Sequence, residues 1–212
     1  KQFIFEARNG IHIIDLGKTL TQLESACNLL SKTVAKGGKV LFVGTKKQAQ
    51  EAVKEAAIAC GQYYVTERWL GGTMTNLKTI RKSINRLKEI ERMETSGTIN
   101  QYVKQEQSAI RREAARLHKN LDGIRDMEQM PAVMFIVDLK REHNAVAEGR
   151  RLNIPIAAIV DTNCDPDLAD YPIAGNDDAI RSVRLILATV VQTITLAKAE
   201  YERVLRFDLA SV

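Results

Sequence analysis

The sequence predicts an α/β protein, built on a doubly wound parallel sheet of the flavodoxin or Rossmann kind, with an antiparallel coiled-coil helical hairpin inserted into it. Three observations predict this fold. Short apolar runs rich in Val and Ile alternate with segments of helical periodicity, Gly, Pro or Asp bounds these runs, and one internal segment has heptad spacing. Because βα units wind in a right-handed sense, the strands are expected to form one parallel sheet.

The expected strands and helices follow one another along the chain. Buried strands are predicted at residues 39–43, 63–65, 132–137 and 154–160. Helices are predicted at residues 19–35, 46–59, 142–152 and 178–205.

The insertion lies between the second and third predicted strands. Its apolar residues recur at alternating spacings of three and four, which is typical of a coiled coil: Leu77, Ile80, Ile84, Leu87, Ile110, Ala114, Leu117, Leu121 and Ile124. Polar residues and Gly97 interrupt this pattern between residues 95 and 100, so the two arms are expected to fold back on each other. We therefore divide the chain into a sheet domain, residues 1–73 and 126–212, and a hairpin, residues 74–125.

Composition narrows the class of protein without fixing it. A chain of 212 residues that is 45% hydrophobic can bury a substantial core, and a net charge of +5 favours an acidic partner such as nucleic acid. Three cysteines without CxxC spacing argue against a disulfide scaffold and for a reducing compartment such as the cytosol. The uncharged stretch 185–197 is too short to cross a bilayer, so we expect a buried helix and no membrane association.

Charge is distributed unevenly along the chain. Residues 68–125 contain thirteen Lys and Arg against six Asp and Glu, whereas residues 161–180 contain six Asp and no Lys or Arg. This polarity suggests one face for RNA and another for a protein partner or solvent. Two unrelated solvated faces remain the alternative.

The hairpin carries most of the basic residues. They are Lys78, Arg81, Lys82, Arg86, Lys88 and Arg92 on the first arm and Arg111, Arg112, Arg116 and Lys119 on the second. A solvated coiled coil also carries charges, but usually balances them, since like-charged neighbours on a helix repel. The excess therefore favours contacts with phosphates.

Residues 68–76 read Arg68-Trp69-Leu70-Gly71-Gly72-Thr73-Met74-Thr75-Asn76 and contain the only tryptophan. A guanidinium beside an indole can bind phosphate and stack, and paired glycines allow close approach of a partner. The alternative is that Trp69 is a core residue and Gly71-Gly72 a turn before a helix.

Two strand ends carry residues that also occur in enzymes. Gly44-Thr45-Lys46-Lys47 follows a strand and opens a helix, a context that suits phosphate, but the second glycine of a full phosphate-binding loop is absent. Asp138 and Asp161 end two strands, where with Asp165 or Asp177 they could bind Mg²⁺ or Zn²⁺. Capping of turns is the alternative reading of these aspartates.

Five segments together resemble one known family. They are Phe3–Asp15, Leu41–Lys47, residues 68–76, Ile159–Asn163 and Gly175–Arg181, and each is similar to the corresponding segment of the bacterial-type small-subunit ribosomal protein two family. Two departures are that the family's preceding stretch with a His-Phe-Gly-His element is not in this sequence, and that Ala174 replaces a usual proline.

The resemblance implies a structural constituent of the small ribosomal subunit that is not an enzyme, needs no cofactor and forms no homo-oligomer. It implies binding to small-subunit ribosomal RNA and neighbouring ribosomal proteins, docking of the messenger-binding ribosomal protein one, and a place in the bacterial cytoplasm or the plastid stroma. The expected RNA contacts are Lys46, Lys47, Arg68, Trp69, Lys78, Arg81, Lys82, Arg86, Arg111 and Arg112. The expected contacts with a protein partner or metal are Asp161, Asp165, Asp177 and Asp178.

Two other functions remain open from the sequence. One is a nucleotide or phosphotransfer enzyme that uses the strand-end aspartates, and the other is a non-ribosomal coiled-coil adaptor that ignores RNA.

Overall fold

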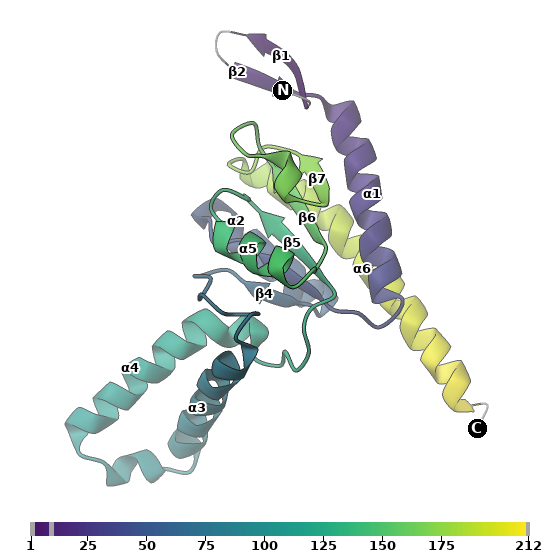
Figure 1. Ribbon diagram of the computed structural model, residues 1–212. Coiled ribbons are helices and arrows are strands. Elements are labelled where there is room, and N and C mark those ends of the chain that lie inside the picture. The colour runs from purple at the N-terminus through teal and green to yellow at the C-terminus, as the bar shows by residue number, and fades with distance from the viewer. Residues whose placement is uncertain (1–2, 9–10, 211–212) are drawn as a thin grey trace.

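The computed structural model describes residues 3–8 and 11–210, so Asn9 and Gly10 of the opening segment lie outside the described residues. Its centre is a five-stranded parallel sheet with the order β4-β3-β5-β6-β7 (Figure 1). The strands are β3 (Val40–Val43), β4 (Tyr63–Val65), β5 (Val133–Val137), β6 (Ile156–Val160) and β7 (Tyr171–Ala174).

Side chains alternate between the two faces of the sheet and build a separate core on each. Val40 and Phe42 of β3 point into one core, and Leu41 and Val43 of the same strand point into the other. Because both faces are covered, the strands are apolar throughout, and β3, β5 and β6 are buried at every residue.

Helices supply the outer layers. The first core is closed by α1 (Leu16–Val34), α2 (Lys47–Cys60) and α6 (Ile180–Ala210). The second is closed by α5 (His143–Arg151) and by the root of the helical hairpin. The result is a three-layered α/β domain, which confirms the predicted fold class.

The hairpin consists of α3 (Leu77–Thr95), the 3₁₀ turn η1 (Thr98–Gln101), α4 (Lys104–Leu121) and the 3₁₀ turn η2 (Asp122–Ile124), and it projects away from the sheet (Figure 1). Its heptad residues Ile80, Ile84 and Leu87 are buried between the arms. Gly97 permits the reversal because its φ of +73° is a left-handed conformation. The predicted division of the chain at residues 74 and 125 stays a prediction.

All four predicted strands are confirmed, but three further strands were not predicted. β1 (Ile4–Arg8) and β2 (Ile11–Ile14) pair antiparallel, and the sequence between them is Asn-Gly, a dipeptide typical of tight hairpins. β7 was hidden because it is short, contains Pro172 and lies inside the acidic stretch. A proline is tolerated there because β7 is an edge strand.

The helix α6 needs separate comment because of its length. Its part from Ile180 to Arg206 has a mean hydropathy of 1.4 and is, by length and composition alone, long and apolar enough to cross a membrane. The shorter estimate from residues 185–197 counted only the uncharged stretch. In this structure the helix packs against α1 and α2 and contributes Val183, Leu187, Val190 and Ile194 to the first core.

Replacing Leu30 of α1 by alanine should lower the free energy of unfolding by about 2–5 kcal/mol, since the side chain is fully buried in the first core. Leu185→Ala is the matched control, because this leucine of α6 is 72% exposed and its loss should cost no more than about 0.5 kcal/mol. Urea unfolding followed by circular dichroism measures both changes. Equal losses would contradict the described packing of α1.

Candidate nucleic-acid interface and strand-end cluster

The order of the strands defines one position at which this kind of sheet can receive a ligand. The chain passes from β3 to β4 in one direction and then returns to place β5 on the other side of β3. Open α/β sheets bind ligands at the carboxyl ends of the strands where this reversal occurs. Here that position is formed by Thr45 and Lys46 after β3 and by Asp138 after β5.

Side chains of the protein itself fill this position. The ammonium nitrogen of Lys46 lies 2.6 Å from Asp178 Oδ1, 2.7 Å from Asp177 Oδ1 and 3.5 Å from Asp138 Oδ2. We call these four residues the strand-end cluster. The Lys46 side chain is 13% exposed and that of Asp177 is fully buried. Asp138 adopts a left-handed backbone conformation with φ of +70°, which is uncommon for aspartate.

The electrostatics of the cluster keep Lys46 charged. Burial alone would lower the pKa of this lysine, but hydrogen bonds to Asp177 and Asp178 and the charge of Asp138 together raise the pKa above its usual range. Burial raises the pKa of Asp177, and the nearby Asp138 and Asp161 add to this effect while Lys46 opposes it. The cluster is therefore held together by one ammonium group shared among carboxylates.

A second internal contact occupies the place of a phosphate. Thr45 donates from its backbone N–H and its hydroxyl to Glu142 Oε1, at 2.8 and 2.5 Å. The Glu142 side chain is nearly fully buried, and burial raises its pKa while the bonds from Thr45 counteract that rise. A carboxylate of this chain thus takes the backbone donor that a phosphate-binding loop would offer.

This placement disagrees with part of the predicted RNA interface. Lys46 was expected to bind a phosphate, but its ammonium group is turned inward and shared among three carboxylates. Asp177 was expected on an acidic surface, but it is fully buried. Asp178 remains 61% exposed, and Asp165 is exposed while its side chain accepts a hydrogen bond from the backbone of Asp167.

Two groups of side chains in the described residues have the spacing to hold a metal ion. They are Asp138, Cys164 and Asp177, and Asp161, Asp177 and Asp178, with ligand atoms within 4.8 Å of one another in each group. Asp177 Oδ2 is buried without a hydrogen-bond partner among the described residues, which fits a missing cation. The ammonium of Lys46, however, already supplies positive charge to this site.

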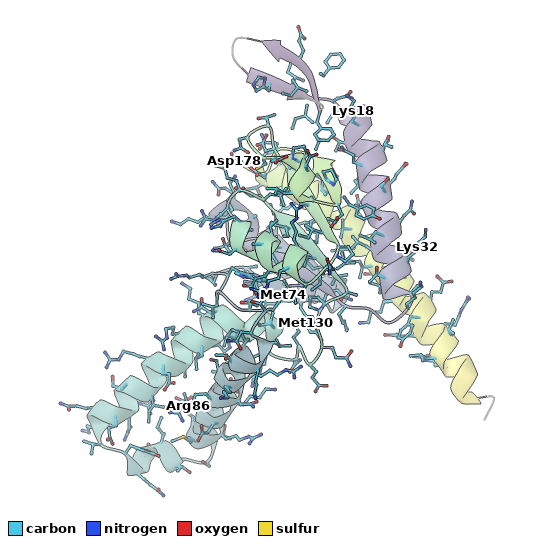
Figure 2. The ribbon with its side chains drawn as sticks, viewed as in Figure 1. Lys18, Lys32, Met74, Arg86, Met130 and Asp178 are labelled. Carbon is cyan, nitrogen blue, oxygen red and sulfur yellow. The ribbon has the colours of Figure 1, made fainter. Side chains whose placement is uncertain are left out.

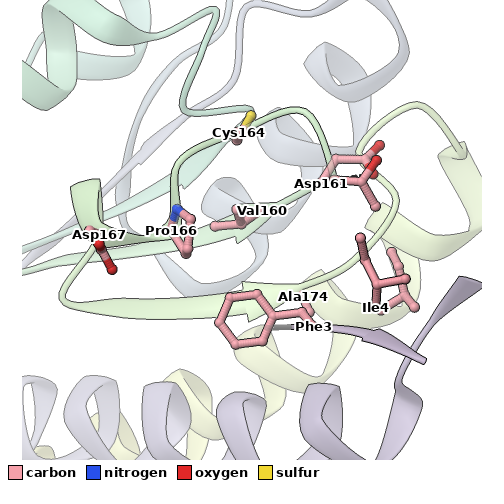
Figure 3. A pocket seen from close by; sticks show the side chains of 10 residues that line it. Phe3, Ile4, Val160, Asp161, Cys164, Pro166, Asp167 and Ala174 are labelled. Atoms are coloured by element: carbon pink, nitrogen blue, oxygen red, sulfur yellow. Dashed lines mark hydrogen bonds between the residues drawn. The ribbon is translucent and has the colours of Figure 1, made fainter. Parts of the chain in front are cut away.

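A cavity of about 250 Å³ lies next to the cluster, between the β1–β2 hairpin and the ends of β6 and β7 (Figure 3). Phe3, Ile4 and Ile14 form its apolar side, and Asp161 and Asp167 lie on its acidic side. The unpredicted N-terminal strands therefore cover part of the predicted acidic surface.

Trp69 lies in the second core and not on the surface. It is 7% exposed, and its indole N–H donates to Glu148 Oε1 of α5 at 2.9 Å. Stacking of this indole on RNA, as predicted, disagrees with its burial, and the alternative of a core residue is the one that agrees. Arg68 beside it is exposed.

Glu148 is the residue of this region that the sequence reasoning missed. Its carboxylate also accepts the backbone N–H groups of Gly72, Met74 and Thr75, at 2.7, 2.9 and 2.9 Å. Burial of the carboxyl would raise its pKa, but the hydrogen bonds from Thr75, Trp69, Met74 and Gly72 together lower the pKa below its usual value of 4.5. A glutamate on a helix 79 residues after Trp69 gives no local signal of this role.

The cations of the hairpin fall into two groups. Arg86 pairs with Glu89 and Glu113, at 2.9 and 3.4 Å, and Arg111 lies 3.5 Å from Glu94. The other predicted cations are exposed and form no ion pair with any described residue: Lys47, Arg68, Lys78, Arg81, Lys82 and Arg112. Figure 2 places Arg86 on the arm and Asp178 at the distant end of the sheet domain.

Fold and site together define a structural binding protein and not an enzyme, because internal side chains fill the position where this sheet would bind a substrate. Residues 1–197 match the family described as Ribosomal protein S2, and the chain belongs to this family.

Two curated relatives illustrate the similarity. Both are named small ribosomal subunit protein uS2 and come from Treponema pallidum, one from strain Nichols and the other from a second strain, of subspecies pallidum. Each is 51% identical over 201 residues, which cover 95% of this chain and 69% of the relative.

Membership of the family decides between the functions that the sequence left open. The chain is a structural constituent of the small ribosomal subunit, so the phosphotransfer enzyme and the non-ribosomal adaptor are both wrong. The relatives are bacterial, in agreement with a cytoplasmic ribosome, and the plastid expectation finds no support.

Replacing Lys46 by methionine should destabilise the protein by about 3–5 kcal/mol at pH 7, because it leaves buried carboxylates without a counter-ion. Adding Asp177→Asn to Lys46→Met should restore part of this loss, and the deficit should shrink towards pH 4 as the carboxylates take up protons. Urea unfolding at both pH values measures these differences. A pH-independent deficit would argue against the shared ammonium group.

Acidification should release the loop that Glu148 binds. Because the folded pKa of Glu148 lies below 4.5, its contribution to stability is fully present above about pH 4.5 and is lost as the pH falls through the folded pKa. Trp69 fluorescence reports the change directly, since its indole N–H binds the carboxylate. The same titration on Glu148→Gln should lack this transition, and an unchanged profile would assign it to another group.

Proposed function

We propose that this chain binds folded small-subunit ribosomal RNA through the exposed, unpaired cations of the hairpin and of the segment that leads into it. The single observation that carries the proposal is the set formed by Arg68, Lys78, Arg81 and Lys82, which are exposed and have no carboxylate partner among the described residues. Phosphates are the chemical groups that such cations bind on RNA.

The spacing along α3 suits a phosphate backbone. Lys78 and Lys82 are four residues apart, about one turn or roughly 6 Å along the helix axis, and therefore point to the same side. Such contacts fix the position of the protein on folded RNA and read its shape more than its sequence.

The paired cations should contribute less. Arg86 and Arg111 can turn to RNA only by giving up contacts with Glu89, Glu113 and Glu94, so part of each phosphate contact is offset by a lost ion pair. Lys46 is left out of the proposed interface because its ammonium group is enclosed by the strand-end cluster. Lys47 and Arg112 stay in it because they are exposed and unpaired within the described part of the chain.

For protein partners, the acidic end of the sheet domain is the proposed surface, including the docking of the messenger-binding ribosomal protein one. Exposed Asp165 and Asp178 support it, because negative charge there would repel a second RNA contact. A divalent cation such as Mg²⁺ or Zn²⁺ at Asp161, Asp177 and Asp178 is the other use proposed for this cluster. Such an ion would have to displace the ammonium group of Lys46.

The double change Arg81→Gln with Lys82→Gln should reduce the salt dependence of binding, because each lost phosphate contact removes about one unit from the slope of log K against log salt. Small subunits depleted of this protein are the binding target, and the slope should fall by about two units. Lys32→Gln with Lys36→Gln is the control, since it removes the same charge from the exposed side of α1 and from the segment that follows it. Arg86→Gln should have a smaller effect, and equal slopes for all variants would contradict the proposal.

A further inference from the structure

The root loop, residues 66–76, connects β4 to α3 and is therefore where the chain enters the hairpin. It contains neither a helix nor a strand, so its backbone N–H groups need partners from elsewhere. Figure 2 shows Met74 of this loop at the junction of hairpin and sheet domain.

One carboxylate supplies most of these partners. Glu148 Oε1 accepts from Trp69 Nε1 and the Gly72 N–H, and Oε2 accepts from the Met74 N–H, the Thr75 N–H and the Thr75 hydroxyl. The five distances lie between 2.7 and 3.0 Å. Hydrogen bonds to a charged acceptor are stronger than neutral ones and strongly directional, so they set the path of the loop.

The end of the hairpin is attached by different contacts. Tyr64 of β4 donates its hydroxyl to Asp122 Oδ2 at 3.0 Å, and Tyr63 donates to the backbone oxygen of Asp126 at 3.2 Å. Gly123 lies so close to Tyr64 that an added Cβ would meet its backbone oxygen at 2.1 Å. The exit of the hairpin is therefore fixed by β4, and the entry depends on Glu148.

Apolar burial alone would keep the root loop attached without fixing its direction. Trp69 and Met74 are both buried in the second core, and non-directional burial tolerates small rotations of the segment between them. The hydrogen bonds to Glu148 remove this freedom directly before α3, which begins at Leu77.

We infer that Glu148 is a positioning residue for RNA binding, which fixes the root loop so that the cations before and along α3 are presented to RNA as one rigid set. This inference rests on the proposed RNA-binding function. A set that is ordered before binding avoids the entropic cost of ordering it on the RNA, so affinity depends on Glu148 although its carboxylate repels phosphate.

The test is Glu148→Gln in the full chain, with binding to small subunits depleted of this protein measured over a range of salt concentrations. A glutamine keeps the size of the side chain, but its NH₂ group cannot accept the hydrogen bonds of one carboxylate oxygen. Affinity should fall about tenfold with the salt slope unchanged, because no cation is removed. Binding is measured at a temperature at which circular dichroism shows both proteins folded.

Two further variants separate positioning from charge and from stability. Glu24→Gln removes the same charge from an exposed position of α1 and should leave affinity unchanged. Thr75→Val removes only the hydroxyl bond to Glu148 Oε2 and should lower affinity about two- to threefold, which keeps the test open if Glu148→Gln does not fold.

The possible results point to different conclusions. A shifted Trp69 emission in Glu148→Gln together with weakened binding supports the inference. A folded Glu148→Gln, or Thr75→Val in its place, that binds as tightly as the wild type overturns it and leaves Glu148 a stabilising residue only. Wild-type binding that does not respond to salt overturns the proposed RNA contacts and this inference with them.

Discussion

The ammonium group of Lys46, shared among Asp138, Asp177 and Asp178, is the interaction on which the character of this molecule depends. It joins the segments that follow β3, β5 and β7, so three separate parts of the chain meet at one charge. In an open α/β sheet this edge would otherwise be a crevice for a ligand. Since the buried ion pairs cost desolvation, they stabilise the fold only as a complete set. The sheet domain is thereby a rigid support whose binding functions lie on its periphery.

The hairpin and its root extend the same logic. Ion pairs within the arm, such as that between Arg86 and Glu113, hold the two helices together, and the remaining cations face outward without partners. Glu148 connects this arm to α5 through backbone donors of the root loop. Charge in this protein therefore has two uses: paired charges fix the parts of the molecule relative to one another, and unpaired charges are available to RNA.

Periodicity was enough to predict the layers and the hairpin, because buried strands and heptad arms record their surroundings in local sequence. The site was harder to predict for the same reason. Lys46 and Lys47 are adjacent and chemically alike, but only Lys46 is enclosed by carboxylates that come from 92, 131 and 132 residues further along the chain. Trp69 was ambiguous because its acceptor, Glu148, lies on another helix. Long-range partners decide such cases, and no local pattern reports them. The Asn-Gly pair before β2 was a local signal that went unused.

The insertion of the hairpin between β4 and β5 also bears on how the chain folds. β3 and β5 are neighbours at the centre of the sheet, and Val40 pairs with Val133, more than ninety residues later. The arms make mainly local contacts and can form early, which shortens the effective loop that must close before β5 reaches β3. During synthesis the apolar edge of β3 consequently waits for the arm to be completed, and that interval is when the chain is most exposed to aggregation.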